Sequence, residues 1–124
     1  MNLRRPRRRR ASALLLVLFV MAITTPLVCL MLEAHTSQIR CTHNHIEHMT
    51  ALYVAEAGVH DAMAELLGDS SWRTGFTSKG FPSDLAHSYT VTLADGTPGQ
   101  IIVTSTGQTA SGYSKTVTAI VTGF

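Results

Sequence analysis

The chain has 124 residues, of which 45% are hydrophobic and 15% charged, and its formal charge is +2. Six of its ten basic residues lie in the first ten positions, so the remainder carries four basic against eight acidic side chains, a formal charge of −4. A mildly acidic body argues against contact with nucleic acid, which needs a basic surface to meet phosphates. Two cysteines are too few for a disulfide-rich scaffold.

A basic leader precedes an uncharged apolar segment. Arginines occupy positions 4, 5, 7, 8, 9 and 10, and residues 11–32 (ASALLLVLFVMAITTPLVCLML) contain no charge. A helix of this length spans the ~30 Å apolar core of a bilayer, and the arginines hold its N-terminal end on the cytoplasmic side. We therefore predict a leader over 1–11 and a transmembrane helix over 12–32. The chain is expected to cross the inner membrane once and to export its C-terminal domain.

A cleaved secretory signal is the alternative interpretation of this segment. Val20-Met21-Ala22 offers a small-x-small cleavage site. Cleavage there would leave the apolar residues from Ile23 to Leu32 exposed at the new N-terminus. Leu32-Glu33-Ala34 fits the cleavage pattern poorly, so an anchor that is uncut or processed differently is the preferred interpretation.

Residues 33–68 continue with an amphipathic helical pattern, and Gly68 followed by Asp-Ser-Ser supplies a stop. Because only Pro26 interrupts the pattern, we expect one continuous helix of ~57 residues, about 85 Å long. Thr24 and Thr25 can help to satisfy the backbone that the proline loosens. The expected apolar face comprises Ile39, Ile46, Met49, Leu52, Tyr53, Val59, Met63, Leu66 and Leu67.

Five residues of this helix are assigned to packing between the helix and the domain. Glu56 lies within the apolar arc, where it either forms a buried pair or reaches water at the domain edge. On the opposite side, Ala51, Ala55, Gly58 and Ala62 align at steps of four, three and four. A mid-helix glycine costs ~1 kcal/mol relative to alanine, so its presence indicates a closely packed neighbour.

A sheet is expected after the helix. Residues 69–87 are predicted to form an irregular loop anchored by the only tryptophan, and three alternating runs follow, separated by turns at 95–99 and 107–112. The fold class is therefore α+β, a long N-terminal helix packed on a small three-stranded antiparallel β-meander, with the exported globular domain over 69–124. The expected inward-facing residues are Tyr89, Val91, Leu93, Ile101, Val103, Tyr113, Val117, Ala119 and Val121.

This layout resembles that of type IV pilin-like proteins. The shared features are a basic leader, a small residue, about twenty apolar residues, a continuing helix and a C-terminal meander. Within that group, Ala-Leu-Tyr-Val-Ala-Glu-Ala-Gly-Val at 51–59 is similar to the "AEAG" helix segment of PilX-type minor pilins, to which the K-type pseudopilins of type II secretion are related. Ser71-Trp72-Arg-Thr-Gly75 is similar to the loop after that helix. The resemblance covers nearly the whole chain through short motifs.

The resemblance implies a non-enzymatic subunit without a cofactor, whose partners are the membrane, a prepilin peptidase and other pilin-like subunits. Leader processing would involve Arg10, Ala11 and Ser12, with Ala11 in place of the usual glycine. Leu16 and Pro26 are assigned to helix assembly. Counted from Ser12, Leu16 takes the position at which major pilins carry a glutamate, and this favours a tip or assembly-priming component. The proline stands earlier than the helix-kink proline of many major pilins.

The chain shows no catalytic motif. Cys41, His45 and His48 share a helix face at steps of four and three, so they are weak candidates for a metal site against the simpler interpretation of a solvated polar collar. Cys29 and Cys41 would lie ~18 Å apart on one helix, whereas a disulfide needs Cα atoms within ~7 Å.

Two functions of different classes stay open. The first is a minor pilin or pseudopilin-like subunit of a type IV pilus or a type II secretion pseudopilus. The second is a signal-anchored envelope protein whose small domain binds a ligand or metal and never polymerises. Processing of the leader distinguishes the two.

Overall fold

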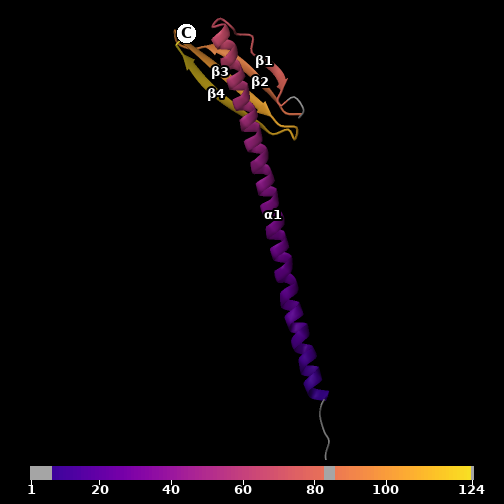
Figure 1. The fold of residues 1–124 in the computed structure, drawn as a ribbon. Coiled ribbons are helices and arrows are strands. Elements are labelled where there is room, and N and C mark those ends of the chain that lie inside the picture. The colour runs from indigo at the N-terminus through magenta and orange to yellow at the C-terminus, as the bar shows by residue number, and fades with distance from the viewer. Residues whose placement is uncertain (1–6, 83–85, 124) are drawn as a thin grey trace, which may run out of the picture. The chain divides into compact units, whose positions relative to one another are not determined.

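The structure, a computed structural model, describes residues 7–82 and 86–123, and within them one helix is followed by four strands. The strands form an antiparallel sheet in the order β1-β2-β3-β4, and α1 packs on one of its faces (Figure 1). This arrangement confirms the predicted α+β class. The elements are α1 (Arg7–Gly68), β1 (Phe76–Gly80), β2 (Ser88–Asp95), β3 (Gln100–Gln108) and β4 (Ser114–Thr122).

The chain divides between Thr42 and His43 into two compact units. The first unit contains the N-terminal part of α1, and the second contains the C-terminal part of α1 together with the sheet. The boundaries predicted at residues 11, 32 and 68 separate segments that differ in charge and hydropathy. The division at Thr42 and His43 instead separates two groups of residues that are each in contact among themselves.

α1 ends at the predicted residue. Gly68 is its last residue, and the N–H of Asp69 donates to the carbonyl of Glu65 at 2.8 Å. The carboxylate of Asp69 then accepts hydrogen bonds from the hydroxyl of Ser71 at 2.6 Å and from its N–H at 2.9 Å. These two bonds hold the pKa of Asp69 below its ordinary value, and they turn the chain away from the helix axis.

The two predicted turns are confirmed as hairpins that join β2 to β3 and β3 to β4. In the second turn, the N–H of Thr109 donates to the carbonyl of Tyr113 at 2.8 Å. Each turn contains a glycine with positive φ, Gly99 at 83° and Gly112 at 88°. Only glycine adopts this backbone conformation without strain, which explains why the turns form at these positions.

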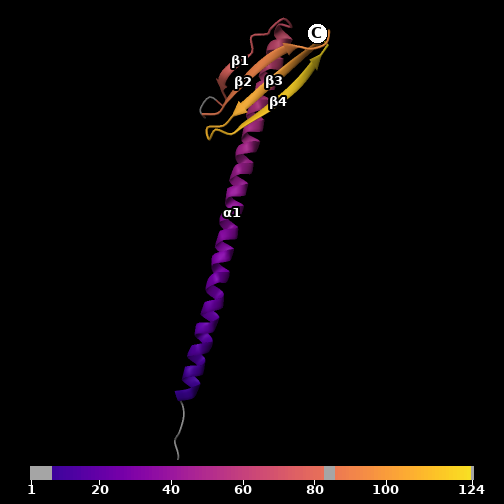
Figure 2. The same cartoon turned by 180° about the vertical axis from the view of Figure 1, so that it is seen from behind.

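The two faces of the sheet differ as the alternation predicts. α1 covers one face of the sheet and leaves the other free (Figure 2). Thr92, Thr104 and Thr118 lie side by side in the strand register and alternate with the buried residues, so they belong to the free face. The opposite face supplies apolar side chains to the core between sheet and helix. That core contains Val54, Ala62, Leu66, Tyr89, Val91, Ile101 and Val103, and the partly buried side chains of Trp72, Phe76, Leu93 and Val121 pack against it.

The prediction of three strands was wrong by one. β1 lies within the segment expected to be an irregular loop, and it pairs with β2 through Phe76 opposite Val91 and Lys79 opposite Tyr89. The register shifts between these two pairs, and Ser78 has a φ of 47°. Only Phe76 of this strand turns an apolar side chain toward the core, so the segment lacks the alternation by which a strand is predicted.

The expected apolar face of the helix was also largely wrong. Most of its large side chains point away from the sheet, with Tyr53 60% and Leu67 81% exposed, and only Val59 and Leu66 are buried. The sheet packs instead on the side that carries the small residues. A Cβ atom on Gly107 of β3 would overlap the backbone of Ala51 and Ala55, so only small residues allow the two elements to approach this closely.

Candidate functional site

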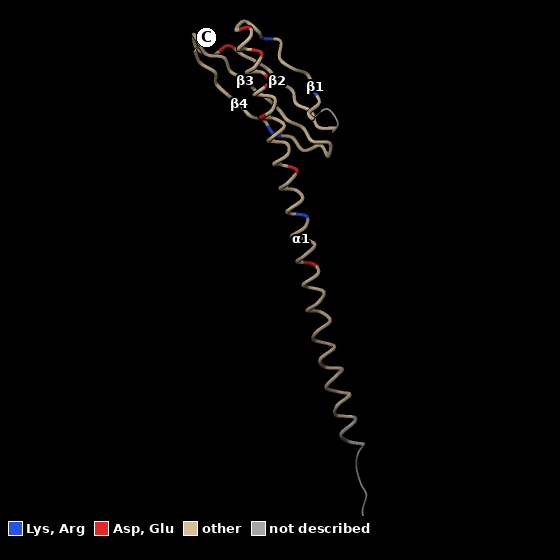
Figure 3. Tube along the Cα trace, viewed as in Figure 1, with Lys and Arg blue, Asp and Glu red and all other residues tan. Residues whose placement is uncertain are grey.

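α1 presents an exposed, uncharged apolar surface from Ala11 to Leu32. Every side chain from Ala11 to Ile46 is exposed, including Leu16, and no Lys, Arg, Asp or Glu occurs between Ala11 and Leu32 (Figure 3). The helix from Ala11 has a mean hydropathy of 2.7 over its most apolar window of 18 residues, none of which is buried. By length and composition this helix can serve as a membrane anchor or as a signal.

Pro26 lies inside α1, so the expected continuity of the helix is confirmed. The missing N–H of the proline removes the hydrogen bond that the carbonyl of Ala22 would accept. The hydroxyls of Thr24 and Thr25 both donate to the carbonyl of Met21, at 3.3 and 2.8 Å. The two threonines therefore bond the backbone one residue before the loosened carbonyl, close to the role predicted for them.

The predicted processing residues lie at the start of this helix. Ala11 and Ser12 are exposed within α1, and the backbone of Arg10 belongs to the same helix. The side chain of Arg10 and the first six residues of the leader lie outside the described part of the chain.

Four of the five residues assigned to helix–domain packing contact the sheet as expected. Ala51, Ala55, Gly58 and Ala62 are buried. A Cβ atom on Gly58 would overlap the hydroxyl of Ser105 and lie 2.8 Å from Tyr89 Cδ2, which confirms that a neighbour packs closely against this glycine.

Glu56 corrects the fifth assignment, because its side chain is exposed and takes no part in the helix–sheet packing. Its position follows from the helix rotation, since it lies on the same outward side as Tyr53, Met63 and Leu67. The sequence left open a buried pair or a carboxylate that reaches water, and the structure shows the second.

A polar cluster that was not predicted from the sequence links α1 to the sheet. The carboxylate of Asp61 forms an ion pair with Lys79 of β1 and accepts a hydrogen bond from the hydroxyl of Tyr89 of β2 at 2.5 Å. The bond from Lys79 is the main reason why the pKa of Asp61 is lowered, and the same pair raises the pKa of Lys79. Burial is the main reason why the pKa of Tyr89 is raised. Since 18 and 28 residues separate these partners in sequence, no local pattern predicts the cluster.

This cluster is poorly suited to catalysis or ligand binding. A shallow hollow of about 540 Å³ lies beside it and is lined by His60 and Phe81 as well. The carboxylate stays ionised at neutral pH and is already paired with Lys79, so it is poorly suited to transfer protons there. The geometry supports a structural role, in which the cluster fixes the rotation of the helix relative to β1 and β2.

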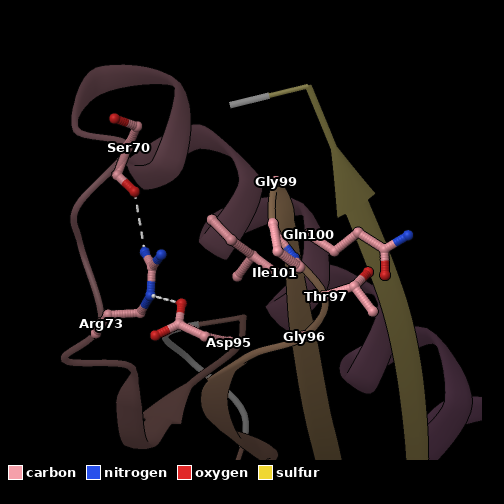
Figure 4. Close-up of a pocket in the computed structure, with 9 residues that line it drawn as sticks. Ser70, Arg73, Asp95, Gly96, Thr97, Gly99, Gln100 and Ile101 are labelled. Carbon is pink, nitrogen blue, oxygen red and sulfur yellow. Dashed lines mark hydrogen bonds and ion pairs between the residues drawn. The ribbon is translucent and has the colours of Figure 1, made fainter.

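A second hollow, of about 440 Å³, lies where the chain leaves α1 and passes the end of β2 (Figure 4). Arg73 spans it, donating from Nε to Asp95 at 2.8 Å and from Nη1 to the carbonyls of Ser70 and Trp72 at 2.9 and 2.8 Å. The guanidinium thereby fastens the segment from Ser70 to Arg73 to the end of β2. We therefore assign Arg73 a role in positioning the loop. This role was not predicted, because a single arginine in a loop carries no sequence signal for its partners.

The structure does not bring the weak metal candidates together as a site. Cys41, His45 and His48 are exposed, and within the described residues no group of three or more His, Cys, Asp or Glu side chains is placed to hold a metal ion. The His48 ring instead lies edge-on to Tyr113, with 4.9 Å between centroids, and the Tyr113 hydroxyl donates to Asn44 at 2.9 Å.

No protein-family model, curated protein or solved structure matches this chain. The candidate site is therefore defined by its own geometry. Each compact unit contributes one feature: the first has the exposed apolar helix surface from Ala11 to Leu32, and the second has the small-residue contact between α1 and the sheet.

Proposed function

We propose that the chain is a non-enzymatic, pilin-like assembly subunit of a type IV pilus or a type II secretion pseudopilus. The observation that carries the proposal is a single helix that exposes uncharged apolar surface at one end and packs on an antiparallel sheet at the other. Such a surface needs lipid or an equally apolar helix around it. Residues 12–32 would serve as the membrane anchor before assembly and as the contact with other pilin-like helices afterwards.

Leu16 supports a place at the filament tip or in the priming complex. In the proteins that this chain resembles, an acid at this position is thought to neutralise the N-terminal amine of a neighbouring subunit in the apolar filament core. An unpaired amine buried in a low dielectric costs several kcal/mol. A repeating subunit with leucine there would meet this cost at every step along the filament, whereas a single terminal subunit would not.

Intact-mass measurement of the protein from the cells that produce it tests the processing step. We expect a mature chain that begins at Ser12, because a prepilin peptidase would cut after the small residue Ala11. A chain that begins at Met1 or at Ile23 would contradict the proposal and favour the signal-anchored alternative.

Immunogold labelling with antibodies against the exported domain tests the placement. We expect sparse label at filament ends. Label spread evenly along filaments would contradict the tip position while leaving the assembly function intact, and the absence of label from any filament would contradict both.

A further inference from the structure

The two edges of the sheet differ in their capacity to accept another strand. β1 has five residues, its pairing shifts register between Phe76 and Lys79, and Ser78 departs from extended geometry. A short strand, an irregular register and a charged residue are features that prevent strand addition. β4 is longer, with nine residues, and it pairs with β3 without any register shift. The central residues of β4 carry no charge. Its outer edge therefore presents a long row of backbone N–H and C=O groups.

The side chains of β4 indicate an unfinished core. On the helix side, Val117 and Ala119 are only half-buried, although Ser105 and Val103 opposite them on β3 are 0% exposed. On the other face, Ile120 is 64% exposed. An additional strand would bury apolar surface on both faces of β4 while satisfying its edge.

The charge distribution along β4 restricts what the additional strand can carry. Lys115, near the start of the strand, is its only charged residue, is exposed and forms no ion pair with the described residues. An antiparallel strand placed beside β4 should therefore be uncharged along its centre. An acidic side chain opposite Lys115 would complete the pairing.

A second copy of the chain fits the edge but does not match its charge. With Thr118 opposite Thr118, an antiparallel pair of β4 strands places Val117 opposite Ala119 and keeps both apolar sides together. The same register places Val121 opposite each Lys115, so a second copy supplies no acidic side chain there. A different protein with an acidic residue at that position is therefore the better occupant, and its being an exported protein rests on the anchored topology of the proposed function.

We propose that the outer edge of β4 is a strand-addition site, at which an extended segment of a different exported protein pairs antiparallel with residues 114–122 and places an acidic side chain opposite Lys115. The main chain would supply most of the affinity, while Lys115 and the alternation of side chains would set the register.

Peptide binding to the full-length chain in detergent micelles tests the charge requirement. The probe is the labelled peptide Ser-Thr-Thr-Val-Thr-Ala-Ile-Glu-Thr, whose eighth residue lies opposite Lys115 when its centre lies opposite Thr118. Its matched control carries lysine at the eighth position. In low salt we expect the glutamate peptide to bind about fivefold more tightly, and Lys115→Glu to reverse the order. High salt should remove the difference. Equal binding of both peptides would overturn the charge requirement.

N-methylation of the glutamate peptide tests the main-chain pairing. In an antiparallel strand the N–H groups of alternate residues point to opposite sides. Methyl groups on one alternate set should abolish binding, and methyl groups on the other set should leave it unchanged. Equal effects of the two sets, or no binding by any peptide, would overturn the strand-addition site. A dimer of the full-length chain that the peptide dissociates would overturn the choice of a different protein as occupant. None of these outcomes depends on leader processing or filament labelling.

Discussion

Gly58 of α1 lies directly against Ser105 of β3, with no room for a methyl group between them. The contact sets the distance between the helix and the sheet at the centre of the core. It also explains why the small residues of the helix face the strands, accompanied by only a few larger ones such as Val54 and Leu66.

Gly58→Ala should destabilise the domain, whereas Gly68→Ala should not. In an exposed helix the glycine-to-alanine change gains up to ~1 kcal/mol, and nothing lies within 4 Å of a Cβ atom on Gly68. At Gly58 the added methyl would overlap the serine hydroxyl and crowd the Tyr89 ring, so we expect a loss of about 1–3 kcal/mol. Thermal unfolding of the full-length chain in micelles, followed by the fluorescence of Trp72, measures both changes. Equal effects at the two glycines would contradict the close contact.

Ser105→Ala should leave the domain equally stable or more stable. The Ser105 hydroxyl is fully buried and has no hydrogen-bond partner in the described part of the chain. A buried hydroxyl without a partner costs about 1–3 kcal/mol, and alanine removes that cost with a small loss of volume. The same unfolding measurement applies, and a loss above ~1 kcal/mol would show that the hydroxyl has a partner.

Asp61→Asn should weaken the domain at neutral pH but not in acid. The pKa of Asp61 is lowered below 3.8 in the folded chain, chiefly by its bond from Lys79. The unfolded chain binds this proton at a higher pH. The stabilisation is therefore complete above about pH 5 and is lost as the pH falls through 3.8 and then through the lower folded pKa.

Melting temperatures of wild type and Asp61→Asn between pH 7 and pH 2 check this expectation. The two curves should differ at pH 7 and converge in acid, and Glu65→Gln on the exposed side of the same helix serves as the control. A constant difference at all pH values would mean that the carboxylate charge is not what stabilises the contact.

Arg73→Lys should loosen the segment between α1 and β1. Lysine keeps the charge but cannot bond Asp95 and two carbonyls at once, so we expect a loss of about 1 kcal/mol. Because Trp72 is adjacent, its fluorescence should also report more solvent in the native state. Lys115→Ala, which removes an exposed side chain of β4, is the control. A similar change in stability and fluorescence in both variants would argue against a positioning role for Arg73.

Glu56→Leu should change the free energy of unfolding by less than ~0.5 kcal/mol, because the carboxylate is exposed. The measurement is again the melting curve in micelles. A shift of several degrees would mean that the residue makes a stabilising contact after all.

The sequence predicts the elements of this fold better than it predicts their contacts. Alternation along 88–122 correctly indicates three strands, because Val91 and Val103 face the core while threonines face outward. The end of α1 at Gly68 follows equally well from local signals. β1 was missed because its pairing comes from β2 and from the packing of Phe76, neither of which leaves a pattern within five residues.

The orientation of the helix could not be predicted by counting apolar residues. Tyr53, Met63 and Leu67 give the stronger apolar arc, yet the opposite side is buried. The choice depends on the sheet, where Gly107 and Ser105 of β3 permit an approach that only alanine and glycine can match. The small-residue stripe carried this information, whereas the Asp61 and Arg73 contacts join residues too distant for any local signal.

The irregular register of β1 limits how many molecules a sheet of this kind can join. A sheet open at both edges can template an unlimited stack, which is the route to fibres. Because the outer edge of β1 is unsuited to pairing, each sheet has only the β4 edge free, and it can accept one additional strand. The register shift between Phe76 and Lys79 thus prevents the sheets from stacking into fibres and limits each sheet to one added strand.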